Sequence, residues 1–145
     1  MTVRARTLGR EAALKVLYQL DLRSDLDDGA IDELVEGLEV RPPDAAEFAK
    51  SLVRGVRRHQ EAIDAELATV ARNWTLERMA VIDRNILRIG AYELLHEPDI
   101  PAAVTIDEAV NMAKAYSTKD SGAFVNGILD RIHQRRATPA EAGEP

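Results

Sequence analysis

Residues 76–95 carry apolar side chains at three- and four-residue steps, and this pattern constrains the fold more than any other. The positions are Leu76, Met79, Ile82, Ile86, Leu87, Ile89, Gly90, Leu94 and Leu95. The spacing predicts a helix, and the positions cover nearly all of its circumference. A helix that is apolar all round is usually buried at the centre of a bundle. The stretch therefore predicts a helical bundle packed around residues 76–95.

Narrower apolar stripes on both sides of this stretch predict the surrounding helices. They lie within residues 8–20, 31–38, 48–70, 106–113 and 124–132. Two helix starts are predicted from capping patterns, Asp44 followed by Glu47 and Thr105 followed by Glu108. Aromatic residues make up only 4 % of the chain, and runs with the alternation typical of strands are few. We therefore predict an all-α fold of about seven helices.

The length and composition bound the domain organisation. A chain of 145 residues, 46 % hydrophobic and 30 % charged, can bury one core. We predict a single domain over residues 1–136 and a flexible tail over residues 137–145. There is no cysteine, which excludes disulfides and thiolate metal sites and fits a reducing cytoplasm. There is also no apolar run of about eighteen residues and no signal-peptide core, so we expect a cytoplasmic protein with no membrane contact.

The charge is unevenly distributed along the chain. The net charge is −6, but residues 1–23 hold five basic and two acidic residues, whereas residues 24–48 hold nine acidic residues and one arginine. A basic end can attract phosphate while the remainder keeps the protein in solution. The candidates for phosphate contact are Arg4, Arg6, Arg10 and Lys15. The alternative is that these side chains are merely solvated, as in many basic N-termini.

The sequence offers no clear catalytic or metal-binding motif. The histidines lie far apart, and only His59 with Asp64, or His96 with Glu97 and Asp99, could be combined into ligand sets. Histidines at helix ends are far commoner than such sites. Glycine loops for phosphate and nucleophile elbows are also lacking. We expect no enzyme activity, no metal and no cofactor.

A polar break over residues 117–122 precedes the last predicted helix. Helix starts have free backbone amides that suit anions such as phosphate, and an aromatic side chain beside one can stack on a base of single-stranded RNA. The candidate residues are Lys119, Asp120, Ser121 and Phe124. The alternative is that Asp120 and Ser121 cap the helix, Phe124 belongs to the core and Asn126 holds a loop.

Three stretches, in this order, resemble the NusB family. They are REAALKVLY at residues 10–18, DRNILRIGAYELL at residues 83–95, and IDEAV through DSGAFVNGILD within residues 106–130. Residues 74–78 are also similar to the family, and the resemblance extends from about residue 4 to 133. The pattern Asp-Ser-x-x-Phe-Val-Asn-Gly at residues 120–127 is the most specific part.

The resemblance implies both a fold and partners. The family fold is all-helical with two packed helical subdomains. The implied role is binding of the boxA element of nascent ribosomal RNA as a heterodimer with NusE, a small-subunit ribosomal protein. Other Nus factors and RNA polymerase would join indirectly. RNA contact falls on Arg4, Arg6 and Arg10, and on Lys119, Asp120, Ser121 and Phe124. The NusE surface falls on Glu77, Asp83, Arg84 and Arg88.

One departure from the family concerns the arginine-rich N-terminus. Consecutive arginines are common there, but in this chain Thr7, Leu8 and Gly9 interrupt them. Fewer phosphate contacts mean weaker RNA binding alone and a shallower salt dependence. We therefore expect stronger reliance on the protein partner.

Three alternatives stay open at this point. The acidic residues 24–48 would suit a helical adaptor that binds protein and never RNA. A NusB-like domain also occurs at the N-terminus of some ribosomal-RNA methyltransferases, but no cofactor-binding βαβ unit follows before Pro145, so we expect no methyl transfer. Self-association as a homodimer is the third.

Overall fold

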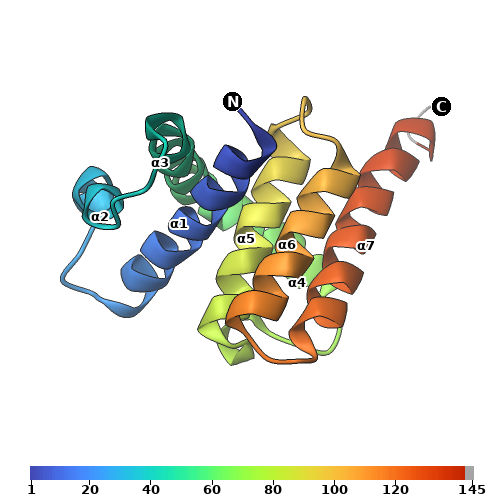
Figure 1. The fold of residues 1–145 in the computed structure, drawn as a ribbon. Helices are drawn as coiled ribbons and strands as arrows, with labels where there is room; N and C mark the ends of the chain where they lie inside the picture. The colour runs from blue at the N-terminus through green and yellow to red at the C-terminus, as the bar shows by residue number, and fades with distance from the viewer. Residues whose placement is uncertain (143–145) are drawn as a thin grey trace. The chain divides into compact units, whose positions relative to one another are not determined.

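The computed structural model describes the backbone of residues 1–142 and the side chains of residues 1–136. This part of the chain forms seven α-helices and two short 3₁₀ turns, with no strand (Figure 1). In order, the elements are α1 (Val3–Leu22), η1 (Asp28–Ala30), α2 (Ile31–Gly37), α3 (Pro43–Arg58), α4 (Gln60–Val70), η2 (Leu76–Arg78), α5 (Val81–His96), α6 (Ala102–Tyr116) and α7 (Ser121–Ala142). The predicted all-α fold is confirmed.

The chain divides into two compact units, residues 1–60 and 61–145. The single domain predicted over residues 1–136 stays a prediction. So does the flexible tail, since the side chains of residues 137–142 and all of residues 143–145 lie outside the described part. None of the helices that the structure describes is long and apolar enough to cross a membrane.

In the first unit, α1 packs along α3, and α2 packs on both. The predicted stripe of α1 is confirmed as core, because Ala13, Val16 and Leu17 are at most 2 % exposed. The two helices approach closely at Gly9. A Cβ added there would lie 2.7 Å from Cδ2 of Phe48 and 2.9 Å from the carbonyl oxygen of Ala45. Only glycine fits this contact without displacing α3.

Exposed ion pairs connect the acidic segment of this unit to α3. The pairs are Lys50 with Glu36, Arg54 with Asp32, and Arg57 with Asp28. The cations follow one another at helical spacing, so one face of α3 is basic and faces η1 and α2. Part of the acidic charge of residues 24–48 is therefore neutralised within the unit.

In the second unit, α5 packs against α6 and α7 (Figure 1). Its residues from Asn85 to Glu93 are all buried, which confirms the prediction of a helix buried on most sides. Polar side chains tie this layer to α4. The Arg88 guanidinium binds both carboxylate oxygens of Asp64, at 2.9 Å and 3.0 Å, and Arg131 of α7 donates to the carbonyl oxygen of Val70 at 3.0 Å.

Several predicted helix boundaries are wrong. Helix α3 begins at Pro43, ahead of Asp44, because proline already has the φ angle of a first helical residue. Helix α6 begins at Ala102, and Thr105 lies inside it, where its hydroxyl donates to Oε1 of Glu93 at 2.7 Å. The central helix begins at Val81 because Met79 has an extended backbone and Ala80, with ψ at 140°, is not helical either.

Candidate nucleic-acid interface

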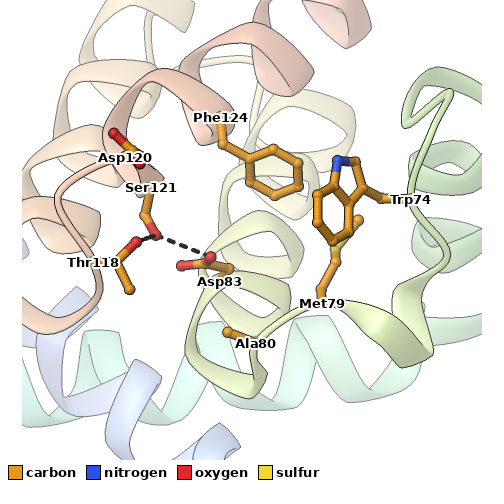
Figure 2. Close-up of a pocket in the computed structure, with 8 residues that line it drawn as sticks. All are labelled: Trp74, Met79, Ala80, Asp83, Thr118, Asp120, Ser121 and Phe124. Carbon is orange, nitrogen blue, oxygen red and sulfur yellow. Dashed lines mark hydrogen bonds between the residues drawn. The ribbon is translucent and has the colours of Figure 1, made fainter.

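A pocket of about 320 Å³ lies in the second unit, at the start of α7 (Figure 2). Its walls come from two segments that are far apart in sequence: residues 74–83, and residues 118–124, which include the loop between α6 and α7 and the first turn of α7. The lining residues are Trp74, Met79, Ala80, Asp83, Thr118, Asp120, Ser121 and Phe124. The pocket is thus aromatic on one side and polar on the other.

The aromatic side consists of Trp74 and Phe124. Their ring centroids lie 5.9 Å apart with an interplanar angle of 74°, an edge-to-face arrangement (Figure 2). Trp74 is 51 % exposed, and Phe124 is half-buried. A large apolar ring left this open to water is available for stacking, and every nucleobase has a flat face to offer.

The polar side is a hydrogen-bonded cluster below the α6–α7 loop. Oδ1 of Asp83 accepts a hydrogen bond from the Ser117 hydroxyl at 2.6 Å, and Oδ2 accepts one from Ser121 at 3.0 Å. The hydroxyls of Ser121 and Thr118 lie 2.9 Å apart. These contacts hold the end of α6 and the start of α7 against the first turn of α5.

The predicted residues of the C-terminal polar break have different roles in this arrangement. Asp120, Ser121 and Phe124 all line the pocket, and Lys119 is exposed beside them. Ser121 is only 3 % exposed, and its hydroxyl donates to the carboxylate of Asp83. Phe124 faces the pocket and Trp74. The exposed surface for a ligand is therefore that of Lys119, Asp120 and the two rings.

The basic side chains of the N-terminus belong to the first unit. Arg4 and Lys15 are exposed. Arg6 is half-buried, and its Nε is buried without a hydrogen-bond partner among the described residues. Arg10 is the exception to the prediction, because it is 2 % exposed and its guanidinium lies 5.4 Å from the centre of the Phe48 ring. It has almost no surface for a phosphate.

One of the residues that interrupt the arginine run, Gly9, has a structural reason. Gly9 and Arg10 lie on the face of α1 that packs on α3, where a side chain at position 9 would overlap Phe48 and Ala45. An arginine at that position would separate the two helices.

The four residues expected at the NusE surface also divide into two kinds. Glu77 is exposed, and Arg84 is half-exposed with Nη1 donating to the carbonyl oxygen of Leu76 at 2.9 Å. Asp83 and Arg88 are only 9 % and 7 % exposed and bind partners inside the second unit. Asp83 and Arg88 therefore have little surface left for a protein partner, whereas Glu77 and Arg84 have more.

Trp74 is the pocket residue that sequence reasoning missed as a ligand contact. The signal was present, since it is the only tryptophan of the chain and begins a short segment that resembles the family. Among the residues that the structure describes, no group of three or more histidine and acidic side chains could hold a metal ion.

Comparison with known proteins identifies the family. The model of the NusB family matches residues 7–134. The transcription antitermination protein NusB of Myxococcus xanthus is 45 % identical over 131 residues, which cover 88 % of this chain and 94 % of that protein. The protein of the same name from Geobacter sulfurreducens is 47 % identical over 131 residues, which cover 88 % and 93 %.

Solved structures agree. T. maritima NusB has a TM-score of 0.80 at 43 % identity and covers 92 % of each chain. A chain in the crystal structure of antitermination factors NusB and NusE in complex with dsRNA has a TM-score of 0.83 at 32 % identity, covering 92 % of this chain and 99 % of that one. The fold and these matches define the class, that of the all-helical transcription antitermination proteins. This chain belongs to the NusB family.

Proposed function

We propose that this protein is an RNA-binding transcription antitermination factor that binds the boxA element of nascent ribosomal RNA together with NusE. The observation that carries the proposal is the pocket at the start of α7, where the exposed Trp74 and the half-buried Phe124 lie opposite a polar loop. Its fold is shared with a chain from a complex of NusB and NusE with dsRNA. The protein acts by binding, in the cytoplasm, and performs no catalysis.

In this proposal the pocket receives an unstacked base. The base lies against Trp74 and Phe124, and stacking on aromatic rings is the usual way in which proteins hold single-stranded RNA. Lys119 is exposed next to the pocket and binds an adjacent phosphate as a point charge. Arg4 and Arg6 of the first unit add phosphate contacts that position the strand but do not read its sequence.

NusE supplies the remainder of the binding surface. Only part of the predicted basic arm has exposed charge, because Arg10 is buried. Few phosphate contacts give weak binding at physiological salt, so the protein alone binds boxA weakly and the pair binds it firmly. Contact with other Nus factors and RNA polymerase follows through this complex.

The adaptor alternative loses its main support. It relied on the acidic residues 24–48 as a surface for protein partners, but Asp28, Asp32 and Glu36 are paired with cations of α3. Asp25 and Glu47 are also paired, with Arg23 and Lys50.

A mobility-shift assay on boxA RNA, with and without NusE, tests the proposal. We expect a shift that is strong only with NusE, and a Kd about tenfold or more higher for Trp74→Ala, because stacking one base on an aromatic ring contributes about 1–3 kcal/mol. Val104→Ala is the matched control, since Val104 is an exposed apolar residue of α6 outside the pocket. Equal shifts of boxA and a scrambled RNA would contradict the proposal.

A further inference from the structure

A single buried carboxylate joins three helix ends of the second unit. Asp83 lies in the first turn of α5, Ser117 directly follows α6, and Ser121 begins α7. Both carboxylate oxygens are used, one by each serine hydroxyl, at 2.6 Å and 3.0 Å. Figure 2 shows the Asp83 carboxylate directed at Ser121.

The partners of this carboxylate are unusual for a buried acid. Asp83 is only 9 % exposed. Among the described residues, the hydrogen bonds to its carboxylate come from hydroxyl groups alone. Burial of an ionised carboxylate is unfavourable unless hydrogen bonds compensate, and bonds from neutral donors to a charged acceptor are stronger than neutral pairs. The two bonds are therefore directional constraints on the loop between the serines.

That loop carries residues with exposed side chains. Thr118, Lys119 and Asp120 are all exposed, and the loop itself is closed by one backbone hydrogen bond, from the Ser121 amide to the carbonyl oxygen of Thr118 at 3.1 Å. A short exposed segment of this kind would sample several conformations if its ends were free. Fixing both ends reduces the entropy that a ligand must remove on binding.

We propose that Asp83 is a positioning residue for RNA binding: it holds the α6–α7 loop in the conformation that presents Lys119 to the RNA backbone. The inference rests on the proposed function. It also assigns Asp83 a role other than partner contact, because the carboxylate is buried and both of its oxygens are occupied.

The direction in which a substitution of Asp83 changes the Kd for RNA distinguishes a positioning role from a purely electrostatic one. Removal of a negative charge beside a phosphate backbone strengthens binding on Coulombic grounds, whereas loss of a positioning residue weakens it. We expect Asp83→Ala to raise the Kd for boxA RNA in the presence of NusE about tenfold, because the RNA must then order the loop on binding. Asp83→Asn keeps one acceptor oxygen and is expected to have an intermediate effect.

Asp64→Asn is the matched control. It also converts a partly buried carboxylate of the second unit to an amide, but its partner is Arg88 and it does not touch the loop. Thermal melts followed by circular dichroism confirm that each variant is folded at the assay temperature. We expect Asp64→Asn to lower the melting temperature and leave the Kd of the folded protein unchanged.

The salt dependence gives a second readout, which a purely structural role would not change. In the wild type, Lys119→Ala should reduce the slope of log Kd against log salt by about 0.7, the value for one phosphate contact on a single strand. In the Asp83→Ala background the same substitution should leave the slope unchanged, since Lys119 is no longer held at the phosphate.

Each outcome has a distinct meaning. The inference is supported if Asp83→Ala raises the Kd and if, in that background, Lys119→Ala no longer changes the salt slope. Wild-type RNA binding by Asp83→Ala overturns it, and so does a loss confined to NusE binding, which would make Asp83 a partner contact; the proposed function survives both. Absence of boxA binding by the wild type with NusE overturns the proposed function and the inference with it.

Discussion

The ion pairs between α3 and the acidic segment of the first unit contrast with the buried polar contacts of Asp83 and Arg88 in the second unit. In the first unit, the ion pairs between α3 and the acidic segment lie on the surface, where Arg54 and Asp32 are 45 % and 56 % exposed. In the second unit, the side chain of Arg88 is 8 % exposed in its pair with Asp64, and Asp83 is hydrogen-bonded to the two serines at the ends of the α6–α7 loop. Water screens the charges of the first set more strongly than those of the second.

This difference indicates what each unit uses its polar groups for. Surface pairs contribute little to stability because solvent competes for both partners. Water cannot replace the partner of a buried group in this way, so removal of one partner leaves a buried charge or donor unpaired. The first unit is therefore stabilised mainly by the close packing of α1 on α3. The second unit uses polar contacts to fix the helix ends around the pocket.

The largest expected effect is on the buried pair of the second unit. Asp64→Ala leaves the Arg88 guanidinium buried without its carboxylate, which typically costs about 3–5 kcal/mol. We expect the lower part of this range, because Asp64 itself is 26 % exposed and water can enter. Chemical denaturation measures the change in the free energy of unfolding. A loss below about 1 kcal/mol would mean that the pair behaves like a surface pair.

A smaller effect is expected at the helix contact of the first unit. Gly9→Ala places a Cβ 2.9 Å from the carbonyl oxygen of Ala45, and backbone cannot move as cheaply as a side chain, so we expect a destabilisation of about 1–3 kcal/mol. Gly37→Ala is the control, since nothing lies within 4 Å of its Cβ position, and it should stabilise by up to about 1 kcal/mol. Equal effects of the two substitutions would remove close packing from the explanation.

The smallest expected effect is on the exposed pairs of the first unit. Arg54→Ala should change the free energy of unfolding by less than about 1 kcal/mol, with the difference reduced further at high salt. The measurement is denaturation at low and high salt. A loss as large as that of Asp64→Ala would show that the two units do not differ in the way described.

The helical fold could be predicted from the sequence, but the partners of the charged residues could not. Apolar residues at three- and four-residue spacing show which face of a helix is buried, and this predicted the core positions of α1 and α5. The same spacing does not show what lies opposite that face. Arg10, Asp83 and Arg88 could therefore be predicted as surface contacts although Phe48, two serines and Asp64 enclose them in the fold.

The candidate site was predictable in part for a related reason. Asp120, Ser121 and Phe124 are close in sequence, so one motif identified them together, and the fold places all three at the pocket. Trp74 reaches the pocket from another segment. Local patterns do not reveal such a contact, since it depends on how the chain returns between α4 and α5.

The central claim is that the pocket between Trp74 and the α6–α7 loop binds an RNA base, and Trp74 itself can report on it. It is the only tryptophan of the chain and is half exposed, so stacking of a base should quench its fluorescence. The direct measurement is a titration of the protein–NusE pair with boxA RNA, corrected for NusE emission. We predict saturable quenching at one RNA per complex, and none with a scrambled RNA. RNA binding that leaves the Trp74 emission unchanged would contradict the account.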